Sequence, residues 1–429
     1  TATGTARVAA VGGDFDYSGG GRFRVQQFVP ARRAWHLITS PLTQTGTLFD
    51  TWQNGGVYTP GQGTLITGPS TGNGFDAVSG SSLKIWDPGT QALADASSTL
   101  VSLSPGSNGS ADNSAYFLYV RGDRHTSNLT MPNTNNTTLS ATGRLQVGPQ
   151  SFTASSLAGR FTLIGNPYAS PVDFNEFART NLVKRFYVWD PSLNTVGGYV
   201  TMDDVDNDGV FTKSVGGSNQ TQEILSHQSF FVETAANGAA GITIDENSKS
   251  DGSSYIISRP LAAARRLVIN LLKPDSTASV MTDGVTAEFG DDWSDTYGPE
   301  DALKFTNINE TFALLRNNRA LALERKPLPQ QADTLFLRIS RHTQRNYQFQ
   351  VIPTGLSGQA FSMLLKDQWT GTEYPLSSTD TTYVGFSVTA DVASSPANRF
   401  RVLFRPYSVL PVKFTRVQAM LRGRQAMVE

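Results

Sequence analysis

Short runs of alternating apolar and polar residues recur through the last third of the sequence, and they constrain the fold more than any other feature. Leu335-Phe-Leu-Arg-Ile-Ser340 and Tyr347-Gln-Phe-Gln-Val-Ile352 have the two-residue period of strands with one buried face. Further runs of strand length, separated by turn residues, lie at residues 266–272, 361–365, 383–388 and 400–404. The pattern predicts a β-sandwich of the jelly-roll or immunoglobulin-like kind over residues 255–406.

The composition extends this expectation to the whole chain. Abundant Gly, Ser, Thr and Asn, with 10% aromatic residues, favour many short strands and tight turns over helices. We therefore expect a mainly β fold with very few short helices. One short helix is expected after the capping residue Asp173, and a helical turn is expected at Pro299–Lys304.

Three landmarks occur twice along the chain in the same order. They are Leu37-Ile-Thr-Ser-Pro41, Ile85-Trp-Asp-Pro88 and residues 115–120 in the first copy, and Leu163-Ile-Gly-Asn-Pro167, Val188-Trp-Asp-Pro191 and residues 228–233 in the second. A repeat of this length indicates a repeated structural unit. The sequence therefore predicts two related β-rich lobes, at residues 31–150 and 151–250.

The two ends of the sequence lie outside these units. The alternating segment Phe23–Phe28 ends at Pro30, and residues 1–30 are interpreted as the end of an upstream β unit. Residues 408–429 are expected to form the first strands of an incomplete immunoglobulin-like module.

Charge and hydropathy exclude some partners. Charged residues make up 17% of the chain and the formal net charge is −1, so no basic face for nucleic acid is expected. Apolar runs such as Leu267–Ile269 are far shorter than the roughly 20 residues of a membrane helix, so no membrane insertion is expected. The absence of cysteine excludes disulfides, thiolate metal sites and cysteine nucleophiles.

The landmarks, together with Tyr119-Val-Arg-Gly-Asp-Arg124 and Leu410-Pro-Val412, resemble large cell-surface and secreted proteins of Bacteroidota that are exported by the type IX secretion system. The resemblance covers nearly the whole chain from about residue 28. It implies an extracellular or outer-surface location, the type IX secretion machinery as a partner, and an immunoglobulin-like module that begins at Leu410-Pro-Val412 and precedes a sorting domain. It implies no particular reaction. Arg121-Gly-Asp123 lies within this pattern and is interpreted as structural rather than as an integrin motif.

Asp204-Val-Asp-Asn-Asp-Gly209 is the strongest chemical signal. Alternate carboxylates followed by glycine are typical of calcium loops, where they converge on one hard cation. Position 12 of this loop is Val215 instead of glutamate, so a further ligand such as Glu223 would come from elsewhere. The alternative is a solvated acidic hairpin. The predicted ligands of a structural calcium ion are Asp203, Asp204, Asp206 and Asp208.

A second acidic group surrounds Trp293 and Tyr297. Aromatic rings beside carboxylates can bind sugars by stacking and by hydrogen bonds to hydroxyls. The alternative is a solvated loop ahead of a helix, because acidic residues suit a helix N-terminus. The acidic members are Asp291, Asp292, Asp295, Glu300 and Asp301.

Metalloprotease and nucleotide-binding motifs are absent from the sequence. The four histidines have no H-x-x-H or H-E-x-x-H spacing, and no phosphate-binding G-x-x-x-x-G-K-[ST] loop occurs. We therefore expect no enzymatic activity and assign no catalytic residue.

Three tripeptides that begin at Asp275, Asp333 and Asp380 match a D-[ST]-[AILMVT] pattern. The pattern resembles the O-glycosylation sequon of Bacteroidota envelope proteins. It would place glycans on Ser276, Thr334 and Thr381.

These observations favour a non-enzymatic extracellular surface protein, either an adhesin-like module or a subunit of a surface fibre or layer. Such a subunit would self-associate through exposed strands or broad surfaces. The alternative is the carbohydrate-binding region of a secreted polysaccharide-acting enzyme, with glycans as partners.

Overall fold

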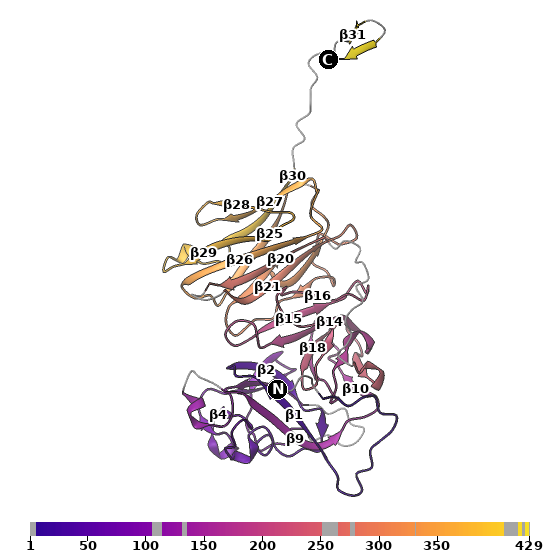
Figure 1. Ribbon diagram of the computed structural model, residues 1–429, viewed down its shortest axis with the longest axis vertical. Coiled ribbons are helices and arrows are strands. Elements are labelled where there is room, and N and C mark those ends of the chain that lie inside the picture. Colours follow the sequence, from indigo (N-terminus) through magenta and orange to yellow (C-terminus); the bar gives the residue numbers. More distant parts are fainter. Residues whose placement is uncertain are drawn as a thin grey trace.

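The computed structural model describes residues 6–104, 114–130, 135–250, 265–274, 279–330, 332–406, 419–422 and 425–428, the last two by their backbone only. Within these ranges the chain is mainly β, its helical elements are single 3-10 turns, and no α-helix occurs. Two lobes and a sandwich follow one another along the long axis of the molecule (Figure 1).

The first lobe is built on a four-stranded antiparallel sheet in the order β2-β8-β6-β7. A three-stranded sheet in the order β1-β9-β3 shares a hydrophobic core with it. The elements are β1 (Phe23–Val29), β2 (Ala34–Thr39), β3 (Leu42–Thr43), η1 (Asn54–Gly56), β4 (Thr67–Gly68), η2 (Thr71–Asn73), β5 (Ala77–Val78), β6 (Leu83–Asp87), β7 (Ala92–Asp95), β8 (Ala115–Val120), η3 (Thr126–Leu129) and β9 (Thr137–Leu145).

The pairing of β1 corrects the predicted boundary at residue 30. β1 pairs with β9 from Phe23↔Gly143 to Val29↔Thr137, and Val29 lies in the core of the first lobe. This segment therefore belongs to the first lobe and not to an upstream unit. The alternation of residues 23–28 identifies a strand, but it contains no information about a partner that follows more than 100 residues later.

The second lobe is built on a five-stranded antiparallel sheet in the order β11-β18-β14-β15-β16. Two smaller sheets, β10-β19-β13 and β12-β17, complete it. The elements are β10 (Gln150–Thr153), β11 (Phe161–Gly165), β12 (Val172–Asp173), η4 (Phe174–Glu176), β13 (Ala178–Thr180), β14 (Leu182–Asp190), β15 (Gly198–Asp203), β16 (Thr212–Lys213), β17 (Glu223–Ile224), β18 (Ser229–Thr234), β19 (Gly241–Ile244) and η5 (Glu246–Ser248).

The main sheets of the two lobes have matching strand orders. The order β2-β8-β6-β7 corresponds to β11-β18-β14-β15, and the strands that carry the three sequence landmarks occupy equivalent places. The relation between the lobes stays a prediction, and this shared order supports it.

The lobes pack against each other through aromatic side chains at equivalent positions. Trp86 contacts Phe231 edge to face at 4.7 Å between ring centroids, and Phe117 contacts Trp189 in the same way at 4.8 Å. In the landmark alignment Trp86 corresponds to Trp189. Phe117 and Phe231 are equivalent by strand register, because they lie opposite the corresponding residues Leu37 and Leu163. Each lobe thus offers the same patch to the other, as the subunits of a symmetric dimer do.

The sandwich is one near-closed sheet folded over a single hydrophobic core. Its order is β28-β27-β30-β25-β23-β24-β21-β20-β26-β29, with β22 paired to β24, and among the described strands of the sandwich only β21 and β24 form a parallel pair. The elements are β20 (Arg265–Lys273), β21 (Val280–Phe289), β22 (Ala302–Leu303), β23 (Thr311–Arg316), β24 (Arg319–Lys326), β25 (Asp333–Ser340), β26 (Arg345–Thr354), β27 (Phe361–Asp367), β28 (Glu373–Leu376), β29 (Thr382–Val388), η6 (Val392–Ser394) and β30 (Phe400–Pro406).

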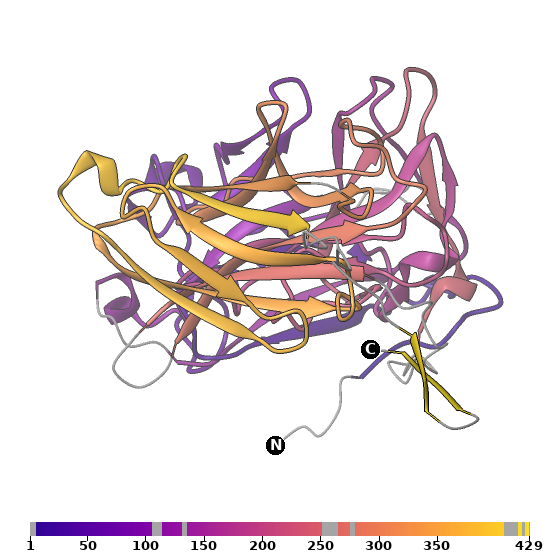
Figure 2. The same ribbon diagram turned by 90° about the horizontal axis from the view of Figure 1, so that it is seen from above.

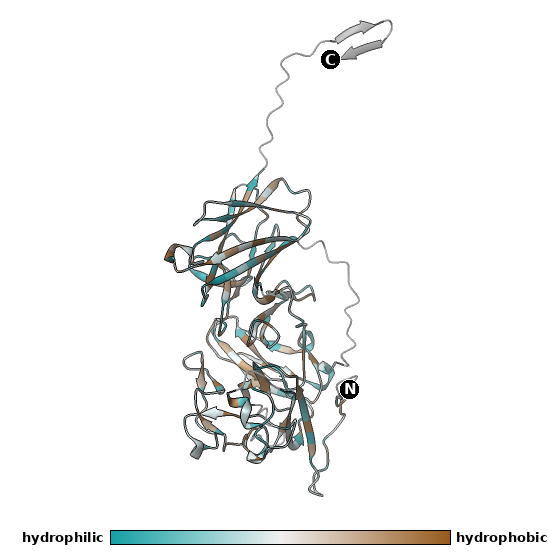
Figure 3. Cartoon of the chain, turned by 60° about the vertical axis from the view of Figure 1, so that its left-hand side comes forward, coloured by the Kyte–Doolittle hydropathy of each residue, from teal (hydrophilic) through white to brown (hydrophobic). Residues whose placement is uncertain are grey.

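Alternation along these strands agrees with the sequence pattern. Leu335, Leu337 and Ile339 of β25 are buried, whereas Phe336 and Arg338 between them are exposed. Hydrophilic and hydrophobic residues alternate along the strands of the sandwich in Figure 3. Seen from above, the orange and yellow strands of the sandwich overlie the lobes (Figure 2).

The two helical predictions have different outcomes. Asp173 caps η4 by accepting a hydrogen bond from the backbone N–H of Asn175 at 2.9 Å, although the turn is 3-10 and only three residues long. Pro299–Lys304 is not helical, and this prediction was wrong. A turn there leads directly into β22, because Ala302 and Leu303 pair with β24.

The last predicted module lies largely outside the described residues. β31 (Ala419–Arg422) and β32 (Gln425–Val428) form an antiparallel pair, and the immunoglobulin-like module stays a prediction. Among the described residues, none of the helical segments has the length and apolar character needed to cross a bilayer.

Candidate functional site

The structure brings three of the predicted calcium ligands together in the loop after β15. Carboxylate oxygens of Asp204, Asp206 and Asp208 lie within 4.8 Å of one another. Positive φ values at Asn207 (57°) and Gly209 (85°) fold the loop back on itself. Glycine adopts such a conformation without steric cost, which explains its place in the motif.

A lysine already pairs with one carboxylate of this loop. The Nζ atom of Lys184 lies 2.7 Å from Oδ2 of Asp204 and donates to Oδ1 of Asn207 at 2.6 Å. Buried Asp204 also accepts hydrogen bonds from the backbone N–H groups of Asp208 (3.0 Å) and Gly209 (3.2 Å). Burial, followed by the charge of Asp208, raises the pKa of Asp206 to about 6. A cation would therefore compete with Lys184 for Asp204.

The fourth predicted ligand, Asp203, lies apart from this group. Its buried carboxylate binds the guanidinium groups of Arg185, at 2.5 Å, and of Arg325. Asp203 is the last residue of β15 and Asp204 is the first residue of the loop, so the sheet holds only the Asp203 side chain. Glu223 is also elsewhere, in β17, where its carboxylate accepts a hydrogen bond from Ser250.

Asp203 is the centre of a buried ion-pair network that joins the second lobe to the sandwich. Arg185 belongs to β14, whereas Arg325 belongs to β24 and also binds Glu288 at 2.9 Å. Burial opposes the charge of Arg185, but its partners, chiefly Asp203, raise its pKa. Buried charges that are all paired in this way are typical of a structural network, and the geometry indicates that this one connects two parts of the chain.

The second acidic group is held by arginines. The guanidinium of Arg325 lies 5.3 Å from the Trp293 ring centroid, and that of Arg319 lies 4.4 Å from the Tyr297 ring centroid. Buried Asp301 accepts a hydrogen bond from the backbone N–H of Arg325 at 2.8 Å. Both rings contact arginines of the same chain and are half-buried. The fully exposed members of the group are Asp291, Asp292 and Asp295.

The predicted glycosylation residues differ in accessibility. Thr381 is exposed in the loop before β29. Thr334 is half-buried within β25, opposite Leu403 of β30. Ser276 lies outside the described residues.

The structural interpretation of Arg121-Gly-Asp123 is confirmed. Asp123 is only 1% exposed and accepts hydrogen bonds from the backbone N–H groups of Gly61 (2.9 Å) and His125 (3.1 Å). The tripeptide cannot present its carboxylate to another protein.

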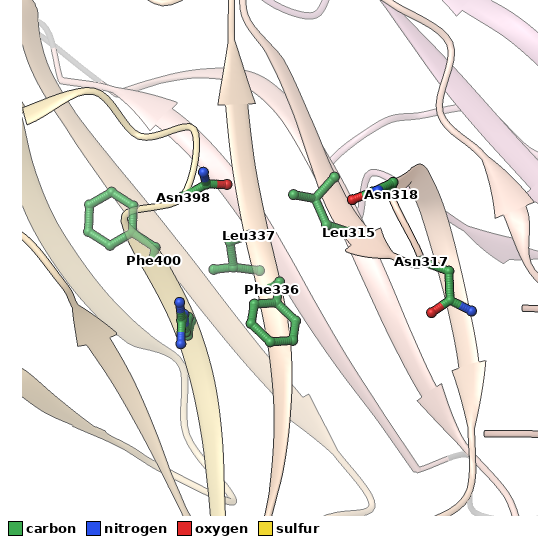
Figure 4. Close-up of a pocket in the computed structure, with 8 residues that line it drawn as sticks. Leu315, Asn317, Asn318, Phe336, Leu337, Asn398 and Phe400 are labelled. Atoms are coloured by element: carbon green, nitrogen blue, oxygen red, sulfur yellow. The ribbon is translucent and has the colours of Figure 1, made fainter. Parts of the chain in front are cut away.

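A hollow on the outer face of the sandwich is the strongest candidate for a binding site, and the sequence predictions did not include it. Its volume is about 560 Å³. Figure 4 shows the Phe336 ring at its centre, with asparagine amides on both sides. The lining residues are Leu315, Asn317, Asn318, Phe336, Leu337, Asn398, Phe400 and Arg401.

Strand register assembles this site. Phe336 of β25 is directly opposite Leu315 of β23 on one side and Arg401 of β30 on the other. Asn317 and Asn318 form the turn between β23 and β24 with φ values of 48° and 61°, which asparagine tolerates better than most residues. Phe336 is 43% exposed, so part of its ring is accessible from the hollow.

A second hollow of about 460 Å³ adjoins the first and shares Asn398 with it. Trp369, which follows β27, is 38% exposed there. The buried guanidinium of Arg399 lies 4.5 Å from the Trp369 ring centroid. Two exposed aromatic rings thus flank one asparagine.

Comparisons with known proteins give one match. A family model described as a domain of unknown function (DUF8693) matches residues 75–404, which include part of the first lobe, the second lobe and the sandwich as far as Phe404 in β30. No curated protein and no solved structure matches the chain.

Proposed function

The chain belongs to the family described as a domain of unknown function (DUF8693). This description assigns no role, so we propose one from the geometry of the chain. The chain is a non-enzymatic, adhesin-like module of the outer cell surface that binds glycans with the sandwich. The observation that carries this proposal is the exposed Phe336 ring in a hollow lined by Asn317, Asn318 and Asn398. An aromatic ring stacks on the apolar face of a sugar, and amides donate and accept hydrogen bonds with its hydroxyls.

The proposed location rests on the resemblance of the landmark strings to proteins exported by type IX secretion. The resemblance covers both lobes, which supply a broad, rigid base for the sandwich. The type IX secretion machinery is accordingly the proposed export partner.

A glycan array probed with the full chain tests the proposal. We expect the chain to bind a defined set of glycans, and Phe336→Ser to weaken that binding by about tenfold or more, because central aromatic contacts dominate binding energy. Tyr383→Ser is the matched control, since Tyr383 is also an exposed aromatic residue on a sandwich strand. Absence of binding to every glycan, or equal losses in both variants, would refute the proposal.

The same hollow fits the alternative role in a polysaccharide-acting enzyme. In that case the chain would prefer long polysaccharides, and a catalytic domain would be joined to it. Sedimentation of the chain with insoluble polysaccharides, compared with the array result, separates the two roles.

Self-association into fibres or layers is the second part of the proposed surface role. The sandwich sheet is open at β28 and β29. β28 is short and contains Pro375, which protects an edge, whereas β29 has seven residues and can accept another strand. Light scattering after size-exclusion chromatography, over a range of concentrations, should detect oligomers that Tyr383→Lys reduces. A monomer at all concentrations would contradict this part.

O-glycosylation is proposed at Thr381, whose exposed loop is accessible to a modifying enzyme, in preference to half-buried Thr334. The intact mass of the native protein should exceed that of the bare chain, and Thr381→Ala should remove the excess. A mass equal to that of the bare chain would exclude the modification.

A further inference from the structure

We propose that the two adjoining hollows form one site for an oligosaccharide that carries carboxylate groups, and that Arg401 binds a sugar carboxylate there. The inference rests on the proposed glycan-binding function and adds the class of ligand. It depends on the charge of the lining, on the fixed positions of the two rings and on the extent of the surface that they span.

The charge of the lining favours an anion. Arg401 is the only charged residue among the eight that line the first hollow, and the other polar residues there are amides. In the part of the chain that the structure describes, no carboxylate pairs with Arg401. Guanidinium groups bind carboxylates through two parallel hydrogen bonds, so a uronate is a better partner for this hollow than a neutral sugar.

Neighbouring arginines show that Arg401 differs from its surroundings. Arg399 binds Asp367 at 2.7 Å, and Arg405 binds Glu373 at 2.7 Å. Arg401 lies between them in sequence and is opposite Lys366 of β27, another cation. Of these three arginines, the one without an acidic partner lines the first hollow.

Packing holds the Phe336 ring and the Arg401 charge together. The Arg401 guanidinium lies 5.1 Å from the Phe336 ring centroid, and the register of β25 and β30 places the two residues opposite each other. A sugar that stacks on the exposed part of this ring would have its carboxylate close to the guanidinium. Since both groups are fixed by the sheet, little conformational entropy is lost on binding.

The Trp369 ring is also fixed before any ligand binds. The backbone N–H of Trp369 donates to the carboxylate of Asp367 at 3.0 Å, and the buried Arg399–Asp367 pair supports the ring from behind. Asp367 is only 2% exposed, so its charge is directed at Arg399 and not at a ligand.

The spacing of the rings suits a chain of sugars. Phe336 belongs to β25, whereas Trp369 follows β27, and β30 lies between these strands. Two strand spacings amount to about 10 Å, so one monosaccharide cannot contact both rings. Asn398 lines both hollows and lies where a bound chain would cross from one ring to the other.

Isothermal titration of the full chain with three probes tests the inference. The probes are an oligogalacturonate, its fully methyl-esterified and therefore neutral form, and a sulfated oligosaccharide of similar length. We expect the oligogalacturonate to bind at least tenfold more tightly than the ester. Arg401→Gln should remove this difference while preserving binding of the ester. Arg405→Gln, which loses the same charge from the same strand outside the hollow, should leave the difference unchanged.

Each outcome is decisive. Equal affinity for the acid and the ester would overturn the inference while the glycan-binding function stands, and so would binding of the sulfated probe alone. If none of the three probes binds, the inference is overturned. If the glycan array is also negative, the proposed function is rejected as well. Retained binding of the ester by Arg401→Gln, with an unchanged melting temperature, shows that this variant is folded.

Discussion

At the scale of single residues, His227 shows how burial makes stability depend on pH. It precedes β18 with a φ of 67°, and burial lowers its pKa to about 4. Between pH 6.5 and 4 the unfolded chain binds a proton at this position and the folded chain does not, so the free energy of unfolding falls as the pH is lowered through this range. His36 contributes in the same direction, whereas Glu324, whose pKa burial raises to about 7, contributes in the opposite direction.

His227→Asn should flatten this dependence. Asparagine tolerates positive φ but does not titrate. The difference in the free energy of unfolding between pH 6.5 and pH 4 should therefore decrease by up to about 3 kcal/mol. Urea unfolding at several pH values measures the effect. The control is His125→Asn at an exposed position. Parallel curves for the wild type and His227→Asn would show that His227 does not cause the dependence.

Asp203 and Asp206 are close in sequence but differ in what their removal should cost. Asp203→Ala leaves two buried arginines, Arg185 and Arg325, without their shared partner and should destabilise the chain by about 3–5 kcal/mol. Asp206→Ala in calcium-free buffer should change stability by less than about 0.5 kcal/mol, since its carboxylate is on an exposed loop. Thermal unfolding of both variants makes the comparison. Equal losses would show that the network contributes no more to stability than an exposed carboxylate does.

At the scale of elements, the Asp204–Gly209 loop provides a test for calcium. If calcium binds, it should raise the melting temperature of a metal-stripped sample, and Asp206→Ala should abolish the increase. Lys184→Gln should increase the calcium affinity, because it removes the ammonium group that competes for Asp204. Differential scanning fluorimetry with calcium and magnesium measures both effects. A metal-stripped sample that does not respond to calcium would leave the acidic hairpin as the explanation.

The sequence predicts strands better than it predicts their partners. The two-residue period identifies β25 and β26. It does not show that Arg401, 65 positions later, lies opposite Phe336, since register depends on the packing of the whole sheet. The same limit applies to β1 and β9. The candidate site was missed because its residues meet only after three strands and two loops assemble.

The Asp-rich loop illustrates the opposite case. Its three carboxylates are close in sequence, so local turn geometry alone brings them together. Asp203 was assigned to the same group because it is adjacent in sequence, but it faces the sandwich and binds Arg325. Neighbouring residues can have side chains in different surroundings. The sequence does not reveal that an arginine from a distant strand lies beside Asp203.

At the scale of the whole molecule, the apolar faces of the two lobes cover each other. Trp86 contacts Phe231, and Phe117 contacts Trp189. A closed contact of this kind leaves those faces unable to recruit another copy. Assembly into a fibre would therefore use the edges of the sandwich, and glycan binding would use its outer face.

Phe305 connects all three parts and allows this architecture to be tested. It leaves the sandwich between β22 and β23 and enters the aromatic cluster between the lobes, where it stacks on Tyr187 at 4.6 Å and contacts Phe161 at 4.6 Å. Because the lobes and the sandwich share this side chain and the Asp203 network, we expect calorimetry to show one unfolding transition.

Phe305→Ala should weaken this coupling at a cost of about 2–4 kcal/mol and separate the sandwich transition from that of the lobes. Tyr383→Ala, at an exposed position, should retain a single transition. Near-ultraviolet circular dichroism identifies which part unfolds first, because the cluster between the lobes contains Trp35, Trp86 and Trp189. Two transitions in the wild type would mean that the lobes and the sandwich are independent units, and the ion-pair network would then stabilise only their contact.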